Sequence, residues 1–281
     1  MSPTERTSIF TVDVEEWFHA NYDDVPPGHG LTDDRVEAQT DTLLALLEEA
    51  GGATATFFVL GDTARAHPAM VARIAAAGHE VASHNLTHDR IDRMASTSFR
   101  EQCRASKALL EDQTQREVVG FRAPSWSVGA SSTPWFWDEL RQAGYRYSSS
   151  VFPFGNFLYG DSRAPRLAHR RDGIWEIPPS TAEVAGRRIP FSGGFYLRVC
   201  PSWLIGLLAS RLVRAGEPVM YYVHPRELDP GQPRIPLSPT NRIIHYTGLR
   251  RTRSKLGRIL AEAPVQSIAA GQLRYLEAPE R

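Results

Sequence analysis

The sequence predicts an α/β protein, a (β/α) barrel that is either distorted or seven-stranded. Two observations lead to this fold class. Short β-rich runs alternate with helical stretches along most of the chain, and reactive side chains follow directly after several of the predicted strands. Alternation of this length is typical of parallel strands joined by crossover helices. In α/β barrels the reactive residues lie at the carboxyl ends of the strands, which is where this sequence places them.

The first half of the chain supplies most of the alternating elements. Its predicted strands are short, apolar or β-branched runs, and three of its predicted helices stop at a glycine. The expected strands are residues 8–14, 54–60, 80–83, 118–121 and 145–150, and the expected helices are residues 36–50, 62–77, 97–113 and 134–143.

Residues 151–194 interrupt this pattern with frequent glycine, proline and arginine. They contain one apolar strand at 173–177 and a hairpin around 185–189. Long irregular segments in compact domains are usually functional or disordered, so we expect an insertion that lines a cleft. Regularity then returns, with a helix at 201–215, a strand at 218–223, a basic amphipathic helix at 248–263 and a last strand at 265–268. Without an internal repeat or linker, residues 1–281 are expected to form a single domain.

Composition gives no reason to expect a nucleic-acid partner. The 281 residues are 42% hydrophobic, and Lys+Arg and Asp+Glu are both 32, so the formal charge is zero. Any charged partner must therefore be argued from local features. Cys103 and Cys200 are too few for a disulfide scaffold. The N-terminus has no apolar core of signal-peptide length, and no run reaches the roughly 18 apolar residues of a membrane span, so we expect a cytoplasmic location.

Carboxylates and histidines follow the predicted strands. Asp13 and Glu15 are two residues apart and face the same side of an extended strand. His84 and His88 are four apart, within reach of one cation, and His224 ends a late strand. A carboxylate with two histidines is a common ligand set for a divalent cation that keeps open positions. One acid is then a metal ligand and the other a base. Two alternatives stay open: Glu16 is the ligand in place of Glu15, or the two histidines are exposed loop residues that bind no metal.

Four segments together resemble a known family. They are Thr11–Glu15, His84–His88, Arg122–Trp126 and Val219–His224. With them the chain, from about residue 8 to 225, resembles polysaccharide deacetylases of the NodB-homology type, carbohydrate esterase family 4. It departs from the family in the D-x-E form of the first motif, in Asn85 where Ser or Thr is common, and in Tyr147–Ser150, which lacks the aspartate expected of the fourth motif.

Three further segments resemble the branch of this family found in bacterial exopolysaccharide clusters. They are Asp13–His19, Phe191–Tyr196 and His224–Asp229. The resemblance implies a NodB-type barrel and a metal-dependent N-deacetylase that acts on an N-acetylated sugar or glycan.

The resemblance also implies a role for each motif residue. Asp13 is the general base, His224 the general acid, and Arg122 holds Asp13 in its ionised form. Glu15, His84 and His88 are metal ligands, and zinc is favoured by the two imidazoles. Trp17, Trp126 and Pro124 lie inside motifs and are expected to bind the substrate in the cleft.

Other interpretations stay open at this stage. The D-x-E form also fits a second function, that of hydrolases that open cyclic amides or ureides. A third candidate function is that of a non-catalytic carbohydrate-binding protein. His224 as a buried structural histidine is a further alternative. The arginine-rich stretches 163–171 and 250–258 are solvated faces or contacts for a phosphorylated or lipid-linked glycan.

Overall fold

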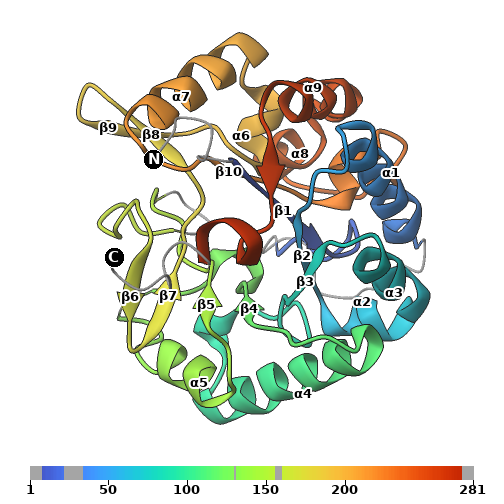
Figure 1. Cartoon of the computed structure of the whole chain (residues 1–281), viewed down its shortest axis with the longest axis vertical. Helices are drawn as coiled ribbons and strands as arrows, with labels where there is room; N and C mark the ends of the chain where they lie inside the picture. Colours follow the sequence, from blue (N-terminus) through green and yellow to red (C-terminus); the bar gives the residue numbers. More distant parts are fainter. Residues whose placement is uncertain (1–7, 22–33, 130, 156–159, 274–281) are drawn as a thin grey trace.

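The computed structural model describes residues 8–21, 34–129, 131–155 and 160–273. Its main element is one curled sheet with helices on the outside (Figure 1). Seven of its strands are parallel neighbours, in the order β10-β1-β2-β3-β4-β5-β7. They are β1 (Ser8–Val14), β2 (Thr56–Val59), β3 (Glu80–Ser83), β4 (Gly120–Phe121), β5 (Tyr147–Ser148), β7 (Ile174–Glu176) and β10 (Met220–Val223). The predicted (β/α) barrel is therefore confirmed.

Two short strands extend this sheet. β6 (His169–Arg171) pairs antiparallel with β7, and β11 (Val265–Gln266) pairs parallel with the start of β1. A separate hairpin, β8 (Thr181–Val184) and β9 (Arg187–Pro190), lies between β7 and β10 in the chain. The strand and the hairpin predicted within residues 151–194 are confirmed, although residues 156–159 of that segment lie outside the described residues.

The segments flanking the hairpin cover the free edge of β10. Gly193 forms a parallel bridge to Tyr222, and the backbone N–H of Met220 donates a 2.9 Å hydrogen bond to the hydroxyl of Ser180. A Cβ atom on Gly193 would lie 2.0 Å from the ring of Tyr222, so this close approach requires glycine. The sheet consequently presents no open edge at β10.

The helices form an outer layer around the sheet (Figure 1). They are α1 (Val36–Glu49), α2 (Gly61–Ala66), α3 (Pro68–Ala76), α4 (Ser96–Thr114), α5 (Phe136–Gln142), α6 (Gly194–Val199), α7 (Ser202–Arg214), α8 (Pro239–Tyr246) and α9 (Leu249–Glu262). Two short 3₁₀ turns follow strands that carry site residues, η3 (Pro124–Trp126) after β4 and η4 (Pro225–Leu228) after β10.

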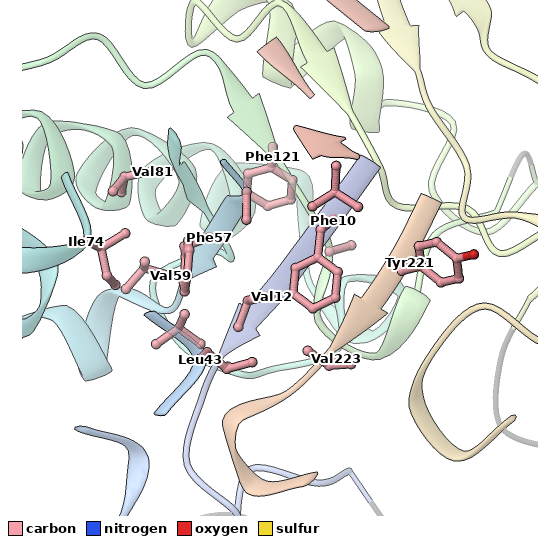
Figure 2. Packing of buried hydrophobic residues seen from close by; sticks show 14 of the residues in the cluster. Phe10, Val12, Leu43, Phe57, Val59, Ile74, Val81, Phe121, Tyr221 and Val223 are labelled. Atoms are coloured by element: carbon pink, nitrogen blue, oxygen red, sulfur yellow. The ribbon is translucent and has the colours of Figure 1, made fainter. Parts of the chain in front are cut away.

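Side chains of β1 alternate between two apolar clusters. Phe10 and Val12 belong to the large core between sheet and helices, together with Leu43 of α1 (Figure 2). Ile9 belongs to a second cluster that includes Phe58 and other residues of neighbouring strands. Because successive side chains of a strand point to opposite faces, Thr11 and Asp13 share the side of Ile9. This alternation directs Asp13 into the barrel.

The structure divides one predicted helix and contains helices α6 and α8, which were not predicted. The single helix expected over 62–77 is two helices, because His67 has non-helical backbone angles, φ −129° and ψ 58°, immediately before Pro68. The residue before a proline is disfavoured in the helical region. Helix α8 lies in a stretch for which no element was predicted.

Candidate active site

The two acids of the first motif lie where β1 ends. Asp13 and Glu15 are both buried, with 2% and 4% of their surfaces exposed, and both line one cleft. Burial alone would raise the pKa of Glu15. The positive charge of His88 and the contacts with His84 and His88 outweigh burial and hold this pKa well below its ordinary value. Glu15 is therefore an anion in a largely dry environment.

Two histidines reach the same cleft from the loop after β3. Asn85 follows the first of these histidines. Its φ of 68° lies in the left-handed region, which Asn tolerates better than most residues. Its side-chain amide donates hydrogen bonds to the carbonyl of Thr87 (3.1 Å) and to Oε1 of Gln102 (2.9 Å). This bend brings the rings of His84 and His88 to a centroid separation of 5.5 Å.

Glu15, His84 and His88 have the arrangement of a cation site. Their ligand atoms all lie within 4.8 Å of one another. Glu15 Oε2 is buried and forms an ion pair with His88 Nε2, but no contact of this oxygen has hydrogen-bonding geometry. His84 Nδ1 lies 2.9 Å from the carbonyl oxygen of Arg122, which only accepts, so Nδ1 carries the proton. In the neutral ring, the lone pair of Nε2 then faces Glu15 Oε2 at 3.6 Å. Two facing acceptors fit a cation held between them.

Arg122 lies behind the acids rather than in the cleft lining. Its guanidinium is fully buried between the rings of Phe58 and Trp126, with ring centroids 4.1 and 4.7 Å away. It donates a 2.7 Å hydrogen bond to Asp13 Oδ1 and a 2.9 Å hydrogen bond to the hydroxyl of Ser149. Ser149 belongs to the segment that lacks the motif-four aspartate, so a neutral hydroxyl contacts the arginine there.

His224 lies between two carboxylates. Its Nε2 is 3.7 Å from Asp13 Oδ2, and its Nδ1 is 3.6 Å from Oε2 of Glu227. Burial opposes the charged form, but Glu227 and, more weakly, Glu15 and Asp13 raise the pKa of His224 above its ordinary value. The histidine thus has a neighbouring acid on each ring nitrogen.

Glu227 is a site residue that the sequence analysis missed. It is fully buried, accepts a 2.9 Å hydrogen bond from Nε of Arg198, and also accepts from the backbone N–H of His224. Burial would raise its pKa, yet His224 and Arg198 lower the pKa to about 2. The signal available in the sequence was its position three residues after His224, in the first turn of η4.

The cleft brings together six of the predicted residues. The lining includes Asp13, Glu15, His84, His88, Trp126 and His224. Aromatic side chains complete one side of it, Trp126, Phe195, Tyr196 and Tyr222. Within the described part of segment 151–194, Gly194 reaches the lining, so the cleft-lining role of the remainder stays a prediction.

The three predicted substrate contacts differ in position. Trp126 lines the cleft, with 5% of its surface exposed. Pro124 is buried in η3, and its neighbours Ala123 and Ser125 contribute to the lining instead. The predicted cleft position of Trp17 is not what the structure shows: this ring is 2% exposed and packs edge-on against Phe18. A large aromatic ring gains most from complete burial, which favours the core.

The alternative ligand Glu16 points elsewhere. Its carboxylate accepts hydrogen bonds from the backbone N–H groups of Arg35 and Val36, at the start of α1. It also lies in a second group with Asp34 and His67. Glu15 rather than Glu16 therefore lies with the two cleft histidines.

The fold and the site define a (β/α)-barrel protein whose carboxylates and histidines meet at the carboxyl ends of its strands. Residues 19–148 match the family model of polysaccharide deacetylases, and residues 149–270 match a second model, the domain of unknown function DUF3473. Residues 19–148 therefore resemble polysaccharide deacetylases, and the resemblance predicted from the motifs is confirmed. The second match covers two of the three segments on which the predicted branch rests.

One sequence relative and two solved structures are similar to the chain. The chain is 35% identical over 82 residues to a chitooligosaccharide deacetylase from Sinorhizobium fredii, a match that covers 28% of this chain and 38% of that protein. A probable polysaccharide deacetylase from Pseudomonas aeruginosa superposes with a TM-score of 0.66 at 15% identity, over 100% of this chain and 95% of the other. A family 4 pseudoenzyme from Bacillus anthracis superposes with a TM-score of 0.50 at 15% identity, over 96% of this chain and 66% of the other.

Neither of the two matched segments contains all of the site residues. His84, His88 and Arg122 lie inside the deacetylase match, whereas Asp13 and Glu15 precede it and His224 lies in the second match. A pseudoenzyme among the structural neighbours also means that the fold alone does not decide activity. The geometry of the cleft must carry the functional argument.

Proposed function

We propose that the protein is a metal-dependent N-deacetylase that hydrolyses the acetamide of an N-acetylated sugar or glycan. One observation supports this most: a single cleft combines the ligand set Glu15, His84 and His88 with a separate carboxylate, Asp13, and a separate histidine, His224. Amide hydrolysis needs an acid and a base as well as electrophilic activation. A protein that only binds sugar needs none of these.

Glu15, His84 and His88 would hold a divalent cation, with zinc favoured by the two imidazoles. When bound, the cation would supply Lewis acidity for the hydrolysis. The remaining roles belong to the chain. Arg122 fixes Oδ1 of Asp13, which leaves the other carboxylate oxygen to accept the proton of the attacking water. Arg122 is thus a positioning residue rather than a catalytic one.

His224 supplies the proton that the departing sugar amine requires. Its raised pKa keeps the imidazole protonated to higher pH than an ordinary histidine. Glu227 lies against the other ring nitrogen of His224 and also forms an ion pair with Arg198. We propose that Glu227 orients His224, in place of the motif-four aspartate that this sequence lacks.

The proposed substrate is an N-acetylhexosamine in an oligomer or a sugar conjugate. The aromatic rings on one side of the cleft suit stacking against a sugar face, and the relative from Sinorhizobium fredii is a chitooligosaccharide deacetylase. The segments shared with exopolysaccharide-cluster proteins support a role in exopolysaccharide synthesis. The single-domain organisation over residues 1–281 and a cytoplasmic location also stay predictions.

A release assay tests the proposal. Protein loaded with zinc is incubated with chito-oligosaccharides and with nucleotide-linked or lipid-linked N-acetyl sugars, and free acetate is measured beside the opening of allantoin and cyclic imides. Acetate from at least one sugar is the expected result. Turnover of the cyclic compounds with no acetate from any sugar would assign the site to the cyclic-amide hydrolases. Binding of oligosaccharide without any turnover would make the protein a carbohydrate-binding relative.

A further inference from the structure

Helices α6 and α7 expose a run of large apolar side chains. Trp203 and Leu207, one helical turn apart on α7, are 70% and 54% exposed, and Val199 at the end of α6 is 43% exposed. The opposite face of α7 already packs into the core through Ile205 and Leu208. The exposed run is therefore not needed to anchor the helix, and apolar surface of this kind marks an interaction site.

The surroundings of this apolar run are strongly basic. The four helices α6, α7, α8 and α9 carry nine basic side chains and one acidic side chain, although the whole chain has a formal charge of zero. Seven of the basic side chains are exposed, and they are Arg211, Arg214, Arg242, Arg250, Arg251, Arg253 and Arg258. Arg198 and Lys255 are buried, and the acid is Glu262. The positive charge is thus gathered on one part of the molecule, where α6, α7 and α9 lie together at the top of Figure 1.

The apolar run and the basic groups adjoin each other. Arg251 and Arg258 line one groove with Val199 and with Ser202, the residue before Trp203. Arg250 and Arg251 line a second groove that again includes Val199. Arg251 and Arg258 are seven residues apart on α9 and so project from the same side of the helix.

These guanidinium groups are not neutralised by the protein. Within the described residues, Arg250, Arg251 and Arg258 form no ion pair with a carboxylate, and all three are exposed. Some surface arginines elsewhere are paired, as Arg141 is with Asp138 at 2.5 Å. Unpaired positive charge beside exposed apolar side chains suits an anionic partner that also accepts apolar groups.

We propose that Val199, Trp203 and Leu207, together with Arg250, Arg251 and Arg258, form a docking face for an anionic membrane surface. Tryptophan and leucine enter the interfacial region of a bilayer, and guanidinium groups attract its anionic headgroups. A second copy of the chain is a poor occupant, because a symmetric contact would oppose two sets of like charges. Membrane attachment here is peripheral: no helix among the described residues is long and apolar enough to span a bilayer.

The docking face adjoins the cleft through one short helix. Phe195 and Tyr196 of α6 line the cleft, and Val199 at the other end of α6 belongs to the docking face. A membrane-bound molecule would consequently keep the cleft near the lipid surface. The inference does not depend on the proposed deacetylase activity, since membrane binding is measured directly.

Co-sedimentation with phosphatidylcholine vesicles, with and without phosphatidylglycerol, tests the proposal. We expect binding only to the anionic vesicles, weakening as salt is added. The double variant Trp203→Ala/Leu207→Ala should bind roughly tenfold more weakly or worse. Arg251→Gln and Arg258→Gln should each weaken binding about fivefold. All substituted side chains are exposed, so thermal melting should stay unchanged.

Matched variants elsewhere on the surface provide the control. Leu167→Ala removes an apolar side chain that is 46% exposed, and Arg104→Gln removes an exposed charge from α4; both should bind like the unmodified chain. Absence of binding to anionic vesicles, or equal binding of all variants, would overturn the proposal. So would a concentration-dependent dimer that Trp203→Ala abolishes without any vesicle binding, because the face would then belong to a second copy.

Discussion

The buried carboxylate of Glu15 lies 3.6 Å from His84 Nε2, an arrangement that a divalent cation would stabilise. Replacing His84 or His88 by Ala should therefore remove most of the bound metal. The measurement is the metal content of chelator-free protein after reconstitution with zinc. His169→Ala, which changes a histidine of β6 away from the cleft, should keep the metal. Stoichiometric metal in the double variant His84→Ala/His88→Ala would remove these residues from the ligand set.

Asp13 and His224 should affect turnover without affecting the metal. Asp13→Asn and His224→Ala each remove a proton-transfer group, so kcat should fall by roughly 10²-fold or more in either variant. Metal content should be largely retained, because neither side chain belongs to the ligand group. If Asp13→Asn loses the metal instead, Asp13 is a ligand and Glu15 becomes the candidate base.

Glu227 should control the pH at which activity declines. The general acid must be protonated, so turnover falls as pH rises through the pKa of His224, which the neighbouring carboxylates raise. Glu227→Gln removes the negative charge that raises the pKa of His224 most. The falling limb of the pH–kcat profile should therefore move to lower pH. Replacement by Asp, which keeps the charge, should move it less. An unchanged profile in Glu227→Gln would limit this residue to a structural role.

At the scale of elements, local signals in the sequence located most strands and helices. The break at Pro68 was readable, since the residue before proline is disfavoured in a helix, but the helical pattern on both sides concealed it. Helix α8 also had a start signal: Ser238 precedes Pro239, and its hydroxyl accepts a hydrogen bond from the N–H of Asn241. Its short length left too little periodicity to identify it.

Local sequence patterns also identified only some of the active-site residues. Asp13, His84 and His224 were identifiable because each follows its own strand, and strand ends meet in an α/β barrel. The pairing of Glu227 with Arg198 joins residues that are 29 positions apart, and no local pattern marks it. The burial of Trp17 is likewise a property of the packed chain and not of its motif.

Arg198 links three elements and should be important for stability. Besides Glu227 in η4, its guanidinium donates to the carbonyls of Ile244 (2.6 Å) and His245 (3.2 Å) in α8. Arg198→Met would leave Glu227 buried without its partner, at a cost of about 3–5 kcal/mol in the free energy of unfolding. Denaturant unfolding measures this. The double variant Arg198→Met/Glu227→Gln should recover part of the loss.

A surface pair gives the matched control for this prediction. Arg141 and Asp138 form an ion pair whose side chains are 53% and 49% exposed. Arg141→Met should change the free energy of unfolding by about 0–1 kcal/mol, because such pairs are well solvated. Equal effects of Arg198→Met and Arg141→Met would argue against a structural role for the buried pair.

At the scale of the whole molecule, the two segments matched by separate family models share one sheet. β7 and β10, from the second segment, pair with β5 and β1 from the first part of the chain. The cleft likewise takes Glu15, His84 and His88 from one part and His224 from the other. Glu227, which lies behind His224, also comes from the second part. The proposed acid and the proposed metal site therefore meet only when both parts are folded together.

The most direct test of the account is acetate release by one preparation before and after removal of its metal. Protein stripped with a chelator should release no acetate from a responsive N-acetylated sugar, and activity should return as zinc or another divalent ion approaches one equivalent per chain. Asp13→Asn treated in the same way should bind the ion and stay nearly inactive. Full acetate release by the stripped protein, or undiminished release by reconstituted Asp13→Asn, would contradict metal-dependent deacetylation in this cleft.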